Sequence, residues 1–387
     1  MTVLDHTPTT AADVLAAVQE LRPTITARAP EIEAGRRIPS DLLDQLIRAG
    51  CFRLLRPRSH GGLGAEFPAA MRVLETLARA DGATGWTTMI GAGSWVDLVH
   101  LPRATFDALF DGKPDAIFAG AFNPSGSISP AADGYRVDGR WAFASGCEHA
   151  DWLFGNCIEG ITEDGPVLRG AVFSPDEVTI EDTWHVSGLR GTGSHHFRAD
   201  GVVVPAERTY LALSEEPCID DPIVRIPVVS LIALAIAPVA TGIALGALDD
   251  VVELAATKMP LLAPAPLATN ALFHHELAAA HTELAAVRAL LWDLAEEAWA
   301  TAIAGHEFTM EQRARMRAAA AWAADRAVAV VETAYRFGGG SSLYDDCPLQ
   351  RRLRDIQALA QHFVVKPDTL TAAGAVLAGQ EPGVMVF

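Results

Sequence analysis

Apolar residues recur at helical spacing through the first third of the chain. Val14, Leu15 and Val18 give residues 11–21 one apolar face, which is typical of a helix. The same spacing predicts further helices over residues 42–49, 68–80, 86–99 and 102–110. Gly50 and the pair Asp81–Gly82 are typical helix ends within this series. Residues 1–116 are therefore predicted to form an N-terminal helical domain.

After residue 116 the pattern changes to short alternating runs separated by turn residues. The runs cover residues 135–137, 140–144, 152–157, 170–173 and 197–204. Asp133–Gly134 and Asp138–Gly139 have the composition of tight turns between antiparallel strands. We therefore expect a central, barrel-like β domain over residues 117–218.

Long Ala-rich helices are predicted for the rest of the chain, residues 219–387. Those over residues 277–304, 310–337 and 349–365 fit the members of a C-terminal four-helix bundle. Ile226–Leu248 has no charge and is long enough to span a membrane, but Pro227 and Pro238 interrupt it and no basic cluster flanks it. We expect it to be a bundle helix buried on all sides. The predicted fold class is α+β, mainly α.

The charge balance and the cysteines limit the partners and the compartment. The 387 residues include 30 Lys and Arg against 48 Asp and Glu, a net charge of −18, so we expect no nucleic acid and no membrane surface as partner. Five scattered cysteines without a CxxC pair, and a start without a signal pattern, favour a cytoplasmic protein. The adjacent pairs His195–His196 and His274–His275 point to different faces of their elements, so we expect no metal site.

Residues 184–194 are the strongest candidate for ligand binding. They contain three glycines, three hydroxyl residues and one arginine. Glycines let the backbone approach a ligand, and successive turn amides can bind an anion. Arg190, Thr192 and Ser194 add donors that suit a phosphate. The alternative is a glycine-rich loop that only connects strands, and no dinucleotide-binding or P-loop pattern is present.

Five motifs, in order, resemble those of the acyl-CoA dehydrogenase superfamily, and most closely its two-component flavin-dependent monooxygenases (group D, oxygenase component). They lie at residues 85–86, 123–126, 139–146, 184–194 and 351–362. The resemblance covers nearly the whole chain. It implies an N-terminal helical domain, a β domain and a four-helix bundle that assembles into homotetramers.

The resemblance also implies a flavin between the β domain and the bundle. Ser145 would lie beside flavin N5, and Trp141 and Phe143 belong to the segment that lies against the ring. The remaining implied cofactor contacts are Asn123 and Pro124 at the flavin edge, Arg190, Thr192 and Ser194 near the phosphate, and Gly338 and Gly339 from a neighbouring subunit. From the residues alone, a turn at Ser145, core positions for Trp141 and Phe143, and a helix stop at Gly338 stay open.

Position 363 separates two activities within this superfamily. Many acyl-CoA dehydrogenases carry a glutamate base there, and this chain has Phe363, which cannot remove a proton. His362 instead matches a histidine that the monooxygenases place above the flavin. An imidazole can deliver a proton or polarise a phenolic substrate near neutral pH, so we expect His362 and Ser145 to be the catalytic residues. A structural histidine is the alternative.

The expected substrate pocket contains Trp86, Gly93, Ser94 and Phe363. Relatives often carry a histidine seven or eight residues after the Gly85–Trp86 pair, where this chain has Gly93 or Ser94. Either a polar group for the substrate is missing, or there is space for a larger substrate.

The resemblance therefore implies an oxygenase that uses O2 and reduced FMN or FAD, supplied by a separate flavin reductase. It would hydroxylate a small or medium aromatic or polycyclic molecule through a flavin C4a-hydroperoxide. The alternatives are N-oxygenation of an amine, dehydrogenation of an acyl thioester, and a non-enzymatic flavin-fold binding or assembly protein.

Overall fold

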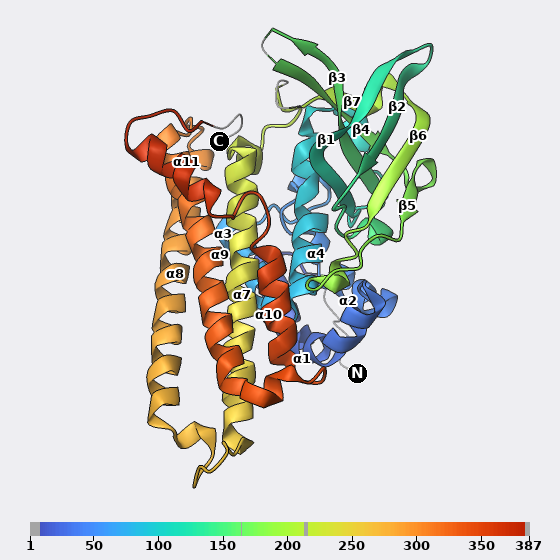
Figure 1. Ribbon diagram of the computed structural model, residues 1–387. Helices are drawn as coiled ribbons and strands as arrows, with labels where there is room; N and C mark the ends of the chain where they lie inside the picture. Colours follow the sequence, from blue (N-terminus) through green and yellow to red (C-terminus); the bar gives the residue numbers. More distant parts are fainter. Residues whose placement is uncertain (1–7, 164, 213–215, 384–387) are drawn as a thin grey trace.

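The computed structural model describes residues 8–163, 165–212 and 216–383, so the outer ends of the predicted first and third domains lie outside the described residues. Figure 1 shows N-terminal helices at the centre, a sheet at the upper right and a long helical bundle at the left. The elements follow the predicted order of helices, strands and helices.

The N-terminal part contains α1 (Ala11–Gly35), α2 (Ser40–Arg48), α3 (Phe67–Ala80), α4 (Gly82–Gly93) and α5 (Arg103–Ala108), with the short helices η1 (Cys51–Arg53), η2 (Arg58–His60) and η3 (Ser94–His100) between them. A capping box at Thr10 begins α1, which continues past the predicted end through Pro23 and Pro30. Ile25 and Ile32 in this second half are fully buried, and α1 packs on α3. Packing therefore outweighs the backbone hydrogen bonds that the two prolines remove.

The central part is one mixed sheet in the order β5-β6-β2-β1-β3-β4-β7 rather than a closed barrel. Its strands are β1 (Phe118–Ala131), β2 (Gly134–Trp141), β3 (Trp152–Thr162), β4 (Gly165–Phe173), β5 (Thr179–Glu181), β6 (His196–Val204) and β7 (Thr209–Leu211), with η4 (Cys147–His149), η5 (Pro175–Glu177), η6 (Arg190–Thr192) and η7 (Ala206–Arg208) between them. The register of β1 shifts between Ala121 and Gly126, and this irregular segment contains Asn123 and Pro124.

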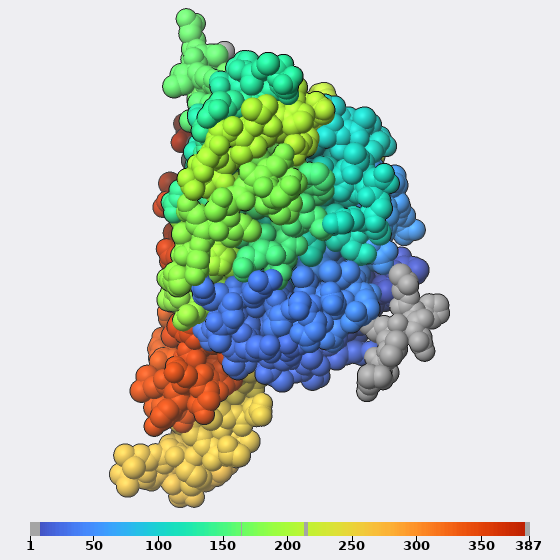
Figure 2. Space-filling view, turned by 90° about the vertical axis from the view of Figure 1, so that its right-hand side faces the viewer, coloured from blue at the N-terminus to red at the C-terminus, as the bar shows by residue number. Residues whose placement is uncertain are grey.

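The C-terminal part contains α6 (Pro222–Arg225), α7 (Val228–Thr257), α8 (Ala271–Ile303), α9 (Met310–Gly338), α10 (Pro348–Leu359) and α11 (Asp368–Leu377), with η8 (Leu267–Thr269) and η9 (Gly339–Leu343). α7 packs on α3, α9 and α10 and lies inside the bundle (Figure 1). The most apolar part of α7 is 83% buried within the protein. The uncharged stretch at residues 226–248 is therefore part of a bundle helix, as predicted. Figure 2 shows the sheet (green) above the N-terminal helices (blue), with the gold and orange connections of the bundle projecting below them.

The last predicted bundle helix, over residues 349–365, is too long. α10 ends at Leu359, and residues 360–367 form turns before α11 begins. The His362 N–H donates to the Leu359 carbonyl over 3.0 Å in the first of these turns. Phe363, which the apolar spacing placed on the buried face, is 48% exposed. His362 therefore lies on a turn and is not held by helix geometry.

Candidate active site

Ser145 lies in a chain of hydrogen bonds between buried side chains. The indole N–H of Trp86 on α4 donates to Ser145 Oγ over 3.0 Å, and Ser145 Oγ lies 2.7 Å from Ser194 Oγ. Ser194 Oγ lies 2.7 Å from Thr192 Oγ1, and Thr192 donates to the Leu189 carbonyl over 2.8 Å. None of these three hydroxyl residues is more than 5% exposed. We call Trp86, Ser145, Ser194 and Thr192 the hydroxyl chain.

The two ends of the hydroxyl chain fix the direction of every hydrogen in it. An indole N–H can only donate and a carbonyl can only accept. Because Thr192 uses its hydrogen for Leu189, Ser194 must donate to Thr192, and Ser145 must donate to Ser194. Ser145 keeps a free lone pair but has no hydrogen left to offer. A ligand atom beside Ser145 therefore meets an acceptor.

Phe143 presents its ring to solvent two residues before Ser145. The side chain is 70% exposed, and the backbone φ of 66° is in a region that disfavours a bulky residue. The Ser145 N–H donates to the Phe143 carbonyl over 2.9 Å and supports this turn. Trp184 meets the Phe143 ring edge-on, with 6.2 Å between centroids. An exposed aromatic face in this position fits a planar ring system such as a flavin.

The glycine-rich stretch is anchored to α10. A Cβ on Gly188 would lie 1.8 Å from the Arg354 carbonyl oxygen, so only glycine allows this close approach. The Leu189 N–H donates to the Asp355 carboxyl group over 2.6 Å, and Arg354 pairs with Glu33 on α1. Arg354 and Asp355 belong to one of the five motifs, but the sequence offers no reason for their presence. The structure shows that they hold the loop at residues 184–194 in place. The burial of Asp355 could not be read from its position in the sequence.

The polar side chains of this loop divide into two groups. Arg190 is half-buried, and its Nε has no hydrogen-bond partner among the residues that the structure describes. It can therefore receive an anion such as a phosphate. The hydroxyl groups of Thr192 and Ser194 instead point inward, toward Ser145. The hydroxyl groups of Thr192 and Ser194 are therefore already paired within the protein, whereas Arg190 has a donor left for a phosphate.

His362 contacts Trp86 from the turn after α10. The two rings meet edge-to-face with 5.5 Å between centroids, and the Phe363 ring lies 5.0 Å from that of His362. Nδ1 of His362 is buried and has no partner in the described part of the chain. Burial lowers the pKa of His362 to about 4, so the imidazole is neutral at neutral pH. A neutral imidazole can polarise a substrate hydroxyl group by accepting its hydrogen bond, but it has no imidazolium proton to deliver.

Trp141 lies in the core of the sheet. It is fully buried, its indole N–H donates to the Asn156 carbonyl over 2.8 Å, and its ring stacks on Phe197 at 4.8 Å. This placement favours the core role that the sequence left open over a contact with the cofactor. Asn123 and Pro124 lie on the irregular segment of β1, where the Asn123 side chain is exposed to solvent.

Open space lies beside the end of α4. A Cβ built on Gly93 would meet nothing within 4 Å, and Gly93 and the next residue, Ser94, are both partly exposed. The Gly93 position therefore favours space for a larger substrate.

Gly338 and Gly339 lie before the beginning of α10, and His362 lies after its end. The Lys258 ammonium group donates to the Gly338 carbonyl over 2.6 Å. The twelve residues of α10, a rise of about 18 Å, separate the two places. Within one chain these glycines do not join Ser145 and His362.

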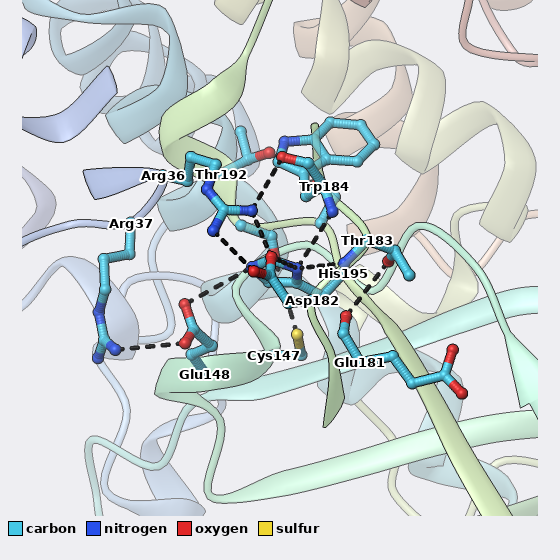
Figure 3. A network of polar contacts seen from close by, with 12 residues as sticks. Arg36, Arg37, Cys147, Glu148, Glu181, Asp182, Thr183, Trp184, Thr192 and His195 are labelled. Carbon is cyan, nitrogen blue, oxygen red and sulfur yellow. Dashed lines mark hydrogen bonds and ion pairs between the residues drawn. The ribbon is translucent and has the colours of Figure 1, made fainter. Parts of the chain in front are cut away.

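A second polar network supports the loop from the sheet side (Figure 3). His195 is buried, and its Nδ1 accepts the backbone N–H groups of Thr183 and Trp184, each over 3.2 Å. Asp182 lies 3.7 Å from the same nitrogen and pairs with Arg36, the C-cap residue of α1. Burial lowers the pKa of His195, so the neutral ring carries its hydrogen on Nε2. No group of three metal-binding side chains lies together in the described ranges.

Comparisons with known proteins agree with this arrangement. Residues 13–100 match the family described as Acyl-CoA dehydrogenase, N-terminal domain, and residues 234–367 match Acyl-CoA dehydrogenase, C-terminal domain. The chain is 30% identical to an indole-3-acetate monooxygenase of Pseudomonas putida, covering 92% of this chain and 91% of that protein. It is also 30% identical to the oxygenase component of an FADH2-dependent resorcinol hydroxylase of a Rhizobium species, covering 92% and 91%.

The structure is similar to the crystal structure of a 3-HSA hydroxylase from Rhodococcus sp. RHA1. The TM-score is 0.87 and the identity 28%, over 95% of this chain and 97% of that one. The predicted fold class and the predicted enzyme class are both confirmed. The chain belongs to the acyl-CoA dehydrogenase superfamily, and within it to the oxygenase components of flavin-dependent monooxygenases.

Proposed function

We propose that this protein takes reduced FMN or FAD from a separate flavin reductase and hydroxylates an aromatic or polycyclic molecule with O2. The bound flavin supplies the activation of O2. Ser145 and Phe143 would receive the flavin ring, Arg190 its phosphate, and the segment at Asn123 and Pro124 its edge. The exposed Phe143 ring and the unpartnered Arg190 Nε support these contacts.

The direction of the hydroxyl chain is the observation that carries the proposal. A flavin has an N–H at N5 only when it is reduced, and the Ser145 hydroxyl group can accept such a hydrogen but has none to give. The chain therefore matches a protein that binds the reduced form. Ser145 already lies in this state before any ligand binds.

A substrate hydroxyl or ring N–H is the natural partner for His362. A neutral imidazole with an unpartnered nitrogen can accept a hydrogen bond from the O–H of a phenol or the N–H of an indole. The names of the two curated relatives include substrates with such groups, indole-3-acetate and resorcinol. A dehydrogenase would need a carboxylate near this place, and Phe363 supplies none.

We further propose a cytoplasmic homotetramer. Leu261, Leu262, Leu343 and Tyr344 are each at least 70% exposed on the two connections that project from the bundle (Figure 2). Apolar residues grouped in this way favour contact with another chain. Gly338 and Gly339 lie at the same end, so a neighbouring copy could bring them to a cofactor.

The test mixes the protein with photoreduced FMN or FAD and then with oxygenated buffer in a stopped-flow instrument. The oxidised flavin spectrum should return more slowly with the protein than without it. Label from 18O2 should enter a phenol or an indole, whereas label on nitrogen would indicate the amine alternative. Return at the rate of free flavin, together with reduction of bound flavin by an acyl thioester under argon, would instead identify a dehydrogenase.

A further inference from the structure

A cavity of about 440 Å³ lies between η3, the sheet and the beginning of α7. Val96, Val99 and Phe122 supply part of its apolar wall, and Ile226 and Val229 close the side toward the bundle. Its volume is within the range of sites that hold organic ligands.

Three residues that line the cavity each carry a buried polar atom without a partner in the described part of the chain. The hydroxyl of Tyr210, Oδ1 of Asn156 and Nδ1 of His100 are buried and make no hydrogen bond within the described residues. Tyr210 is 2% exposed and Asn156 is 4% exposed. Asp97 also lines the cavity, and burial raises the pKa of its carboxyl group to about 7. Unsatisfied buried polar atoms are costly, and several on residues around one cavity indicate a ligand toward which these side chains turn. We call Asp97, His100, Asn156 and Tyr210 the cavity cluster.

The sheet brings two members of the cavity cluster to one face. Asn156 on β3 pairs with Gly170 on β4, and Gly170 pairs with Tyr210 on β7. A Cβ on Gly170 would lie 2.2 Å from the Tyr210 ring, so the glycine lets this ring lie across the sheet. His100 of η3 stacks above it, with 6.3 Å between ring centroids.

One face of α4 and η3 leads from Trp86 to the cavity. Along this segment, positions 90, 93, 94, 97 and 100 are partly exposed, while most residues between them are buried. They recur every three or four residues, as positions on one helix face do. Gly93 leaves open space between the two ends. The eleven residues from Trp86 to Asp97 span at least about 16 Å.

We infer that the cavity cluster is the recognition site for the far end of the substrate, which is an extended multi-ring molecule bearing a hydroxyl or amino group at that end. The inference rests on the proposed function. Asn156 Oδ1 can only accept, and the Asp97 carboxyl group accepts or pairs with a cation, so a donor at the ligand end satisfies both. A carboxylate at that end would be repelled by Asp97. Two arginines, Arg225 and Arg313, also line the cavity, and Arg225 pairs with Asp220.

The test compares three probes with the same extended three-ring body: 4,4″-dihydroxy-p-terphenyl, 4-amino-4″-hydroxy-p-terphenyl and 4″-hydroxy-p-terphenyl-4-carboxylic acid. Their dissociation constants are measured by calorimetry on the wild-type protein with reduced FMN, without O2. The diol and the amine should bind at least about tenfold more tightly than the acid. Asp97→Asn should reduce this preference about tenfold, and Tyr210→Phe should weaken diol binding several-fold. Asp44→Asn, an exposed carboxyl on α2, is the matched control and should change nothing.

Equal or tighter binding of the acid by the wild type would overturn the inference, and so would a preference that Asp97→Asn leaves unchanged. Because the first comparison needs no variant, it stands even if a variant fails to fold. Reduced-flavin binding and the return of the oxidised spectrum are measured on the same samples. A protein that passes those two measurements but prefers the acid contradicts only this inference, whereas failure of both contradicts the proposed function.

Discussion

The hydroxyl chain and the cavity cluster lie along the same face of α4 and η3, and they differ in how their polar atoms are satisfied. In the hydroxyl chain every hydrogen has a partner within the protein, from the Trp86 N–H to the Leu189 carbonyl. In the cavity cluster three buried polar atoms have none within the described residues. Ser145 and Ser194 of the first set and Asn156 and Tyr210 of the second are each at most 5% exposed. The difference therefore belongs to their roles and not to their depth in the protein.

This difference separates positioning from recognition. A fully paired network holds one geometry without a ligand, which suits the place where the flavin must be presented in a fixed orientation. An unpaired set of donors and acceptors is completed only by a ligand of matching chemistry, which suits the place where substrates are distinguished. We therefore expect changes to the hydroxyl chain to alter the flavin and changes to the cavity cluster to alter substrate preference.

The largest effect is expected from His362→Ala, because His362 contacts Trp86 at the positioning end and has an unpartnered nitrogen. Loss of a positioned base typically lowers the rate about 10²–10⁴-fold. Product per reduced flavin should fall and H2O2 should rise, while flavin affinity stays within a few-fold of wild type. Peroxide assay and product chromatography on the same reaction measure both quantities. His275→Ala, an exposed histidine on α8, is the control, and wild-type product yield in His362→Ala would remove His362 from the chemistry.

Arg190→Gln should have the next largest effect. A hydrogen bond to a charged group contributes about 1.5–3 kcal/mol, so reduced-flavin affinity should fall roughly ten- to hundredfold. Thr192→Val should leave the phosphate contact intact, because the Thr192 hydroxyl points inward. Titration with reduced flavin measures the dissociation constant of both variants and so decides which side chain binds the phosphate. Arg136→Gln, at the far end of β2, is the control and should bind flavin as the wild type does. A larger loss for Thr192→Val than for Arg190→Gln would reverse the assignment.

Ser194→Ala tests the direction of the hydroxyl chain. The variant removes the acceptor for Ser145, so the unfolding free energy should fall by about 1–2 kcal/mol. The freed Ser145 hydrogen can then also turn toward oxidised flavin, so the preference for reduced over oxidised flavin should shrink several-fold. Urea unfolding and titration with both flavin forms measure these two effects. Ser187→Ala, an exposed serine of the same loop, should leave both unchanged, and an unaltered preference in Ser194→Ala would show that the direction of the chain does not matter.

The sequence predicted the order of the three parts and brought Trp86, Ser145 and His362 into one expected site through the resemblance. It failed where the outcome depends on contacts between distant segments. α1 continues through two prolines because Ile25 and Ile32 are buried, and no local pattern shows that burial. The inward direction of Thr192 was equally hidden, since it depends on where the 184–194 stretch meets Ser145.

The cavity cluster was beyond sequence reasoning for the same physical reason. Asn156 and Tyr210 are 54 residues apart and meet only through the register of β3, β4 and β7. Gly93 was the one signal that pointed to it. Because glycine has no side chain, the sequence analysis gave a larger substrate as one of two alternatives. The structure shows open space beside Gly93.

The smallest effect is expected from Asp97→Asn in the absence of ligand, and its sign depends on pH. Burial raises the pKa of Asp97 from 3.8 to about 7 in the folded protein. Between these values the unfolded chain loses the proton while the folded protein keeps it, so the wild type loses stability as pH rises through this window. The variant has no such proton, so its stability advantage should be near zero at pH 4 and should grow as the pH rises through this window toward pH 8. Urea unfolding at both pH values measures the difference.

The lowered pKa of His362 is common to the wild type and the variant, so its effect on the difference in stability cancels. An equal or larger advantage at pH 4 would show that the Asp97 carboxyl group is already paired, and the contrast with the hydroxyl chain would then be lost.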